Sequence, residues 1–108
     1  MIPQLAAAEL ARWRADGSRA PPLLVDVREP WEFAYCRIED SLSIPLGELA
    51  RRRDELPRER PLVLVCHHGQ RSQHAAMLLA GAGFEQVHNL QGGVESWAVD
   101  VDPAMKRY

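Results

Sequence analysis

Two short runs of almost wholly apolar residues constrain the fold of this chain more than any other feature. They are Leu23–Val27, which contains one acid, Asp26, and Leu62–Val65. An alternating pattern would place one face of a strand in water, whereas a continuous apolar run suits a strand that is buried on both faces. Such strands occur in parallel sheets whose two faces are covered by helices. The two runs therefore predict the centre of a sheet of this kind.

Helix-like stretches alternate with the apolar runs, as expected of an α/β domain. In the first stretch, Leu5, Ala8 and Trp13 share one face. Outside the two central runs, the sequence predicts further elements: strands at 43–45 and 87–90, and helices at 5–15, 30–35, 46–56, 71–80 and from 94 onward. The tail that follows has little periodicity, and Val101 and Tyr108 are its residues best able to pack back on the domain.

The length and composition indicate one globular domain that spans residues 1–108. A chain of 108 residues has room for a single core, and its apolar share of 46% and charged share of 26% are ordinary. The formal charge of −2 predicts neither a nucleic acid nor a membrane surface as a partner. The one basic run, Arg51–Arg53, is followed by Asp54 and Glu55, which favours a solvated helix face over a docking patch.

No segment predicts secretion or membrane insertion. The first residues lack a positively charged start, and no apolar run approaches the length of a membrane span. We therefore expect a cytoplasmic protein without a membrane partner. In that compartment the two cysteines, Cys36 and Cys66, are expected to be reduced, catalytic or redox-active more often than disulfide-bonded.

Cys66 is the strongest candidate for a chemically active residue. It ends a buried strand and is followed by a short loop with Gly69 and then by a helix start. The first N–H groups of a helix have no partner inside it, and together with the helix dipole they stabilise negative charge. A thiolate at that point is a nucleophile, and Arg71 adds a positive charge able to hold an anion. A buried structural cysteine is the alternative, but the glycine, the arginine and the helix start favour chemistry.

The ordered set of motifs around this cysteine resembles one known family. The run Cys66–Ser72 looks like the active-site loop of rhodanese-like sulfurtransferases, and Asp26–Phe33 resembles the Asp-Val-Arg-Glu segment of that family. Further along, Gly92-Gly93 and Trp97 resemble its C-terminal signature. The resemblance extends in order from about residue 23 to residue 97, and the tail resembles the end of rhodanese domains fused to enzymes that activate sulfur-carrier proteins.

The resemblance implies a fold, a reaction and a set of site residues. The fold is a three-layer α/β domain with a central parallel sheet of about five strands flanked by helices. The reaction moves sulfane sulfur from thiosulfate or a persulfide donor to cyanide or a thiol, such as that of a protein, through a persulfide on Cys66, without a cofactor or metal. The residues implied are Cys66 as catalytic; His67, His68, Gly69, Gln70, Arg71 and Ser72 as substrate-binding; and Asp26, Arg28 and Glu32 as structural support.

Two other functions remain open from the sequence. The first is a non-catalytic binding module on the same fold, which the presence of Cys66 disfavours because such modules often lack the cysteine. The second is a cysteine phosphatase or arsenate reductase, whose loop resembles this one but is longer by one residue between cysteine and arginine. A metal site at His67 and His68 is disfavoured, because adjacent histidines in a tight loop do not easily face one ion. These rings are expected to shape the pocket rim, and their charge to tune Cys66 near neutral pH.

Cys36 and the acidic residues near it have two interpretations each. The family commonly has glycine where this chain has Cys36, so the local turn is expected to differ if that glycine serves a special backbone angle. Cys36 is either a second thiol that pairs with Cys66 or, as we favour, a small side chain that fills space. Asp26, Arg28 and Glu32 are interpreted as structural rather than as a catalytic acid cluster, with Arg28 pairing with Glu32. The oligomeric state is not readable from the sequence.

Overall fold

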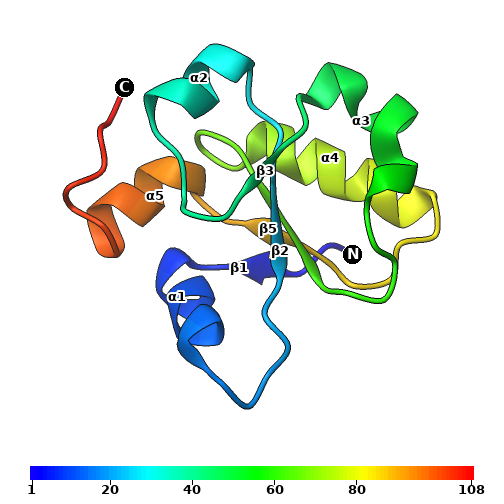
Figure 1. Cartoon of the computed structure of the whole chain (residues 1–108), viewed down its shortest axis with the longest axis horizontal. Helices are drawn as coiled ribbons and strands as arrows, with labels where there is room; N and C mark the ends of the chain where they lie inside the picture. The colour runs from blue at the N-terminus through cyan, green and yellow to red at the C-terminus, as the bar shows by residue number, and fades with distance from the viewer.

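The chain folds around a sheet of five parallel strands. A computed structural model describes all residues from 1 to 108 (Figure 1). Listed across the sheet, the strands are β1 (Gln4–Leu5), β5 (Val87–Leu90), β4 (Leu62–Val65), β2 (Leu23–Asp26) and β3 (Leu42–Ser43). The central strand β4 pairs with β2 on one side and with β5 on the other. Cys66 follows directly after this central strand, at the carboxyl edge of the sheet where open α/β domains bind ligands.

Helices cover both faces of the sheet and form three layers. α1 (Ala7–Ala15) and α5 (Gly93–Asp100) lie on one face, and α3 (Leu46–Arg52) and α4 (Gln70–Gly81) lie on the other (Figure 1). The short α2 (Pro30–Tyr35) follows β2. Proline begins α2, where its missing N–H costs nothing, and Glu32 accepts a hydrogen bond from the Glu29 N–H at 2.9 Å.

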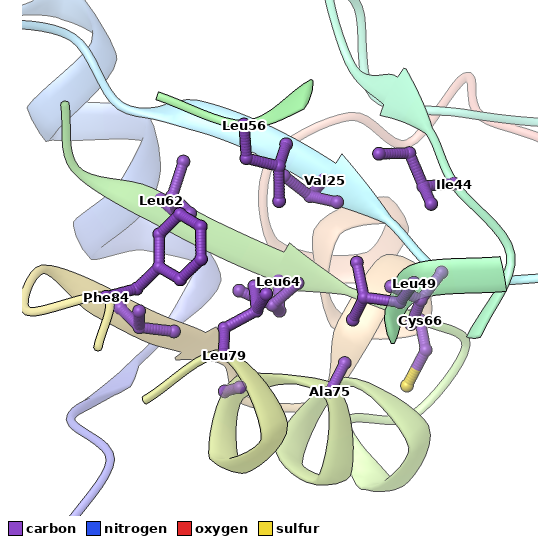
Figure 2. Packing of buried hydrophobic residues seen from close by; sticks show 13 residues of the cluster. Val25, Ile44, Leu49, Leu56, Leu62, Leu64, Cys66, Ala75, Leu79 and Phe84 are labelled. Atoms are coloured by element: carbon purple, nitrogen blue, oxygen red, sulfur yellow. The ribbon is translucent and has the colours of Figure 1, made fainter. Parts of the chain in front are cut away.

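Each face of the sheet has its own apolar core. Leu62 and Leu64 of β4 point into a cluster of 13 buried residues with α3 and α4, whereas Val63 and Val65 point into a cluster of 10 with α1 and α5. Figure 2 shows the first cluster, with Cys66 at its edge beside α4. The continuous apolar sequence of β4 is thus explained, since alternate residues enter different cores. The predicted three-layer α/β fold is confirmed.

The N-terminal segment differs from the prediction. Leu5, expected at the start of the first helix, lies with Gln4 in the edge strand β1, and the N–H of Gln91 donates to the carbonyl of Leu5 at 2.8 Å. The helix then begins at Ala7, and its buried residues are Ala7, Leu10 and Trp13. Ala8, predicted on the inner face, is exposed, because the later start shifts which residues face the sheet.

Two further boundaries move by a few residues. The helix predicted over 46–56 ends at Arg52, and a turn of 3₁₀-helix over Arg53–Glu55 completes it. The strand predicted at 43–45 lies at 42–43, since the residues after it turn into α3 at Pro45. The strands at 62–65 and 87–90 and the helix α2 match their predicted ranges. None of the helices combines the length and the hydrophobicity that crossing a bilayer requires.

Candidate active site

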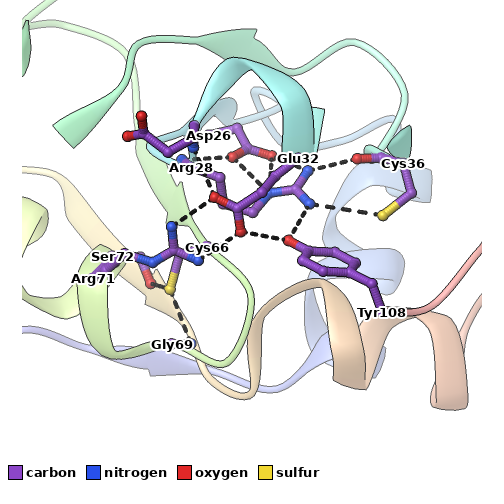
Figure 3. Close-up of polar contacts among 10 residues, drawn as sticks. Asp26, Arg28, Glu32, Cys36, Cys66, Gly69, Arg71, Ser72 and Tyr108 are labelled. Carbon is purple, nitrogen blue, oxygen red and sulfur yellow. Dashed lines mark hydrogen bonds and ion pairs between the residues drawn. The ribbon is translucent and has the colours of Figure 1, made fainter. Parts of the chain in front are cut away.

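The Cys66 thiol lies where a central strand gives way to a helix. Cys66 is 1% exposed, and its loop reaches α4 through Gly69, whose φ of +103° lies in the left-handed region. This turn brings the Gly69 N–H to within 3.1 Å of Cys66 Sγ, to which it donates a hydrogen bond (Figure 3). Gln70, Arg71 and the next residue open the helix, where N–H groups lack intrahelical acceptors. The sulfur therefore accepts one backbone N–H bond beside the start of a helix, a position that favours an anion.

A buried polar network supports the sulfur from below. Ser72 Oγ lies 3.2 Å from Cys66 Sγ and donates to Asn89 Oδ1 at 2.6 Å. The Asn89 amide donates in turn to the Gly69 carbonyl at 3.1 Å and to Gln4 Oε1 at 2.8 Å. Asn89 comes from β5, so this strand fixes both the serine and the loop glycine. The network orients the sulfur and leaves its opposite side open.

Arg71 is held by an acid from α2. Its two terminal nitrogens donate to the two Glu32 oxygens at 2.8 and 2.9 Å (Figure 3). The hydrogen bonds from Arg71 lower the pKa of Glu32 to about 2, so the carboxylate is charged at neutral pH. The bidentate pair fixes the guanidinium plane at the mouth of the pocket. The negative charge of Glu32 also offsets much of the positive charge that Arg71 would otherwise present to a dianionic substrate.

The pairing predicted between Arg28 and Glu32 is wrong. Arg28 is fully buried, and its guanidinium donates to Asp26 with Nη2 at 2.7 Å from Oδ2. Arg28 also donates to the Cys36 carbonyl at 2.6 Å. Burial opposes the charge of Arg28, but hydrogen bonds to Asp26 and the charge of Asp26 raise its pKa above the ordinary value. Two separate ion pairs therefore lie side by side beneath α2, because Glu32 turns toward the loop instead.

The two loop histidines are stacked on each other and on a residue of the tail. The His67 and His68 rings lie 3.9 Å apart, and the Tyr108 ring lies 3.9 Å from the other face of His67. Burial, then the electrostatic effect of the neighbouring His68, lowers the pKa of His67 below its ordinary value. The surroundings of His67 thus favour the neutral form of this ring. Its Nε2 is buried without a hydrogen-bond partner, which also disfavours the charged form.

The start of α5 holds the loop from the opposite side. Val94 donates its N–H to the Cys66 carbonyl at 2.9 Å, and Glu95 donates to the His67 carbonyl at 3.1 Å. These contacts need Gly93, because a Cβ built there would lie 2.3 Å from the Cys66 carbonyl oxygen. Gly93 also has a φ of +57°, which suits glycine. Gly92 and Gly93 thus form a tight turn against the active loop, and the turn clamps the backbone of Cys66.

The space above the sulfur is small. A cavity of about 110 Å³ is lined by Cys66, His67, His68, Gln70 and Arg71. Larger hollows lie elsewhere, but none of them includes Cys66 among its lining residues. The cavity admits a group of a few atoms and places it between the sulfur and the Arg71 guanidinium.

Comparison with known protein families shows to which family the chain belongs. A family model described as "Rhodanese-like domain" matches residues 6–100. The chain belongs to the rhodanese-like family. The match includes Cys66 and its loop, together with the segments that hold Glu32 and Gly93.

Named relatives and solved structures agree with this assignment. A protein named "Sulfurtransferase" from Allochromatium vinosum is 41% identical over 76 residues, covering 70% of this chain and 71% of the relative. "Thiosulfate sulfurtransferase GlpE" from Pseudomonas syringae is 43% identical over 75 residues, covering 69% and 71%. The crystal structure of a rhodanese-related protein from Thermoplasma volcanium matches with a TM-score of 0.81 at 30% identity, covering 92% of this chain and 93% of that one.

The rhodanese-like site divides the predicted substrate-binding residues into two groups. His67, His68, Gln70 and Arg71 line the cavity, whereas Gly69 and Ser72 are buried beneath it and contact the sulfur. Contact of the first group with a substrate stays a prediction. Nowhere in the chain do three side chains of His, Cys, Asp or Glu gather in a geometry that suits a metal ion.

Cys36 lies apart from Cys66 in this rhodanese-like domain. Both thiols are free and buried, and Figure 3 shows them on opposite sides of the polar network. Cys36 has a φ of −157°, an extended angle open to any residue, so replacing the usual glycine requires no unusual turn. Its Sγ contacts Arg28 Nη1 at 3.7 Å. These contacts fit a side chain that fills space beside the arginine.

Two residues of the site were not found from the sequence of this rhodanese-like chain. Asn89 was predicted only as part of a strand. A polar side chain in an otherwise buried strand does indicate that it has hydrogen-bond partners inside the fold. Tyr108 was expected to pack on the domain, but nothing in the sequence indicated its contacts with Arg28 and Glu32. Both reach the site only through the tertiary fold.

Proposed function

We propose that this chain is a sulfurtransferase that carries sulfane sulfur as a persulfide on Cys66. The observation that carries the proposal is a small cavity lined by both Cys66 and Arg71, with the Gly69 N–H donating to Cys66 Sγ. The naming of relatives as sulfurtransferases supports the same chemistry. Loop length supports it against phosphatase chemistry, since only four residues separate Cys66 from Arg71.

The proposed reaction has two displacement steps. In the first, the Cys66 thiolate attacks the outer sulfur of thiosulfate, or the outer sulfur of a persulfide, and a new S–S bond forms as the old one breaks. Sulfite, or the donor thiolate, leaves with the electron pair of the broken bond. In the second step, cyanide or an acceptor thiolate attacks the outer sulfur of the Cys66 persulfide, and the Cys66 thiolate leaves. Charge is conserved in both steps, and neither needs a metal or an organic cofactor.

The site residues divide the work of these steps. The Gly69 N–H and the N–H groups that open α4 stabilise the negative sulfur before and after transfer. The Arg71 guanidinium faces the leaving group, and Ser72 keeps the cysteine rotamer fixed through its 3.2 Å contact. The small volume of the cavity favours a compact donor such as thiosulfate or the exposed end of a persulfide.

Intact-protein mass spectrometry tests the proposal. The protein is incubated with thiosulfate, and separately with a low-molecular-weight persulfide, and then with cyanide. We expect a mass gain of one sulfur atom that cyanide removes and that is absent from Cys66→Ala. Cys36→Ala is the matched control, because Cys36 is the other buried cysteine, and it should still gain the sulfur. Absence of an adduct on Cys66 with both donors would contradict the proposal and favour a binding module.

A further inference from the structure

The C-terminal tail returns to the active-site loop and places an aromatic ring there. Residues 101–108 run from the end of α5 toward α2 (Figure 1). The Tyr108 ring stacks on His67 with 3.9 Å between centroids and 15° between planes. The edges of Trp31 and Tyr35, both from α2, meet the same ring at 5.7 and 5.8 Å. The tail thus joins α2 to the loop that carries Cys66.

The Tyr108 hydroxyl connects the two ion pairs beneath α2. It accepts a hydrogen bond from Arg28 Nη1 at 2.8 Å and donates one to Glu32 Oε1 at 2.8 Å (Figure 3). Glu32 holds Arg71 with both of its oxygens. Burial, offset in part by the hydrogen bond from Arg28, raises the pKa of Tyr108 to about 12, so the hydroxyl keeps the proton that it donates. A continuous chain of hydrogen bonds therefore runs from buried Arg28 to Arg71 at the cavity.

We propose that Tyr108 is a positioning residue of the Cys66 site, acting through Glu32 to place Arg71 and through its ring to place His67. Both of these residues line the cavity above the sulfur. The hydroxyl also shares the negative charge of Glu32, which leaves more of the Arg71 charge available to an anion in the cavity. The effect on sulfur transfer rests on the proposed function, whereas the placement of Arg71 does not.

The tail has other anchors, which allow the hydroxyl to be tested alone. Val101 and Met105 pack on the core shared by α1 and α5. Arg107 pairs with Glu95, and the Lys106 ammonium lies 5.4 Å from the Tyr35 ring centroid. Tyr108→Phe should therefore keep the tail docked and the ring stacked, and remove only the two hydrogen bonds. Tyr35→Phe is the matched control, because it removes a neighbouring exposed phenol whose hydroxyl makes no hydrogen bond in the structure.

Alkylation of Cys66 by two reagents measures the placement of Arg71 without sulfur chemistry. Iodoacetate is an anion and iodoacetamide is its neutral analogue, so the ratio of their rates reports the positive charge presented at the cavity. We expect Tyr108→Phe to lower the iodoacetate-to-iodoacetamide ratio by about three- to tenfold, the value of one hydrogen bond. Tyr108→Ala should lower it at least as much, and Tyr35→Phe should leave it unchanged.

Thiosulfate kinetics and unfolding complete the test. In Tyr108→Phe, the KM for thiosulfate should rise by a similar factor while kcat changes little, because the sulfur and its donors are untouched. An alkylation ratio equal to that of the wild type in Tyr108→Phe would overturn the proposal, even if urea unfolding showed a loss of stability. If the wild type accepts no sulfur, the proposed function fails, and the alkylation ratio still decides the role of Tyr108.

Discussion

Arg28 shows at the scale of a residue how a full charge is accommodated inside this domain. Its side chain has no exposed surface, and Asp26 is the only acid that pairs with it. Its other oxygen acceptors, the Cys36 carbonyl and the Tyr108 hydroxyl, are neutral. The arginine links β2, the end of α2 and the tail through these contacts. The buried charge of Arg28 thus depends on one carboxylate as its counter-ion.

Asp26→Asn tests this dependence. The amide keeps the shape of the side chain but leaves Arg28 as a buried charge without a counter-ion, which costs about 3–5 kcal/mol. Urea unfolding should show this loss of stability. Asp40→Asn is the matched control, since the Asp40 side chain is 85% exposed, and it should stay within about 0.5 kcal/mol of the wild type. A loss below about 1 kcal/mol for Asp26→Asn would mean that the charge of Asp26 does not hold Arg28.

At the scale of elements, the start of α5 determines the shape of the active loop. The backbone N–H groups of Val94 and Glu95 hold two loop carbonyls, and the chain can approach so closely only at glycine. A Cβ at Gly93 would meet the backbone carbonyls of the active loop, whereas a Cβ at Gly92 would meet Ser96 of α5 itself, and both glycines have a positive φ. The two adjacent glycines are therefore not equivalent.

Gly93→Ala should weaken both the fold and the site. The positive φ and the collision with backbone carbonyls together cost roughly 2–4 kcal/mol in urea unfolding. Gly47→Ala is the control on α3, where nothing lies within 4 Å of an added Cβ, and its stability should equal or exceed that of the wild type by up to about 1 kcal/mol. Cys66 in Gly93→Ala should also react with iodoacetamide at a rate different from that of the wild type. A Gly93→Ala protein as stable as the wild type would contradict the view that the close approach of α5 to the active loop requires glycine at position 93.

The sequence predicts well those helices and strands whose bounds are marked by local features of the sequence. β4 and α2 are recognisable because an apolar run bounded by proline, and proline at a helix start, are local signals. β1 was not predicted, because a strand of two residues has no period and exists only by pairing with β5. Ala8 was wrongly placed on the inner face of α1 for the same reason, since the position of β1 decides where the helix begins, whereas Trp13 is buried as predicted.

At the scale of the whole molecule, the candidate site combines one continuous loop with residues that are distant in the sequence. The loop from Cys66 to Ser72 is contiguous, so its residues and spacing are readable from the sequence. The contact between Tyr108 and Glu32 spans 76 positions, and that between Ser72 and Asn89 spans 17. Such contacts depend on the order of strands and on the return of the tail, which composition and periodicity do not specify. The predicted pair of Arg28 with Glu32 was wrong because Glu32 pairs instead with Arg71, which is 39 positions away along the chain.

The stability of the assembled molecule should depend on pH in two separate ranges. The pKa of His67 is lowered, so the unfolded chain takes up this proton more readily than the folded one. Stability is therefore full above the unfolded value of about 6.5 and falls as pH decreases through the folded pKa. Glu32 has a pKa of about 2, so its contribution is lost only below the ordinary value near 4.5. Urea unfolding from pH 7.5 to 3 should show both losses.

His67→Gln separates the two ranges, because glutamine does not titrate and still fills part of the space between Tyr108 and His68. The charged groups that act on His67 are His68, Glu95, Glu32 and Arg28, and all of them remain in the variant. The variant should be less stable than the wild type at pH 7.5, since the stacked ring is lost, but its stability should fall less between pH 7 and 5. The loss below pH 4.5 should persist, because Glu32 still pairs with Arg71. Equal slopes above pH 5 in both proteins would show that burial of His67 between the rings does not disfavour its charge.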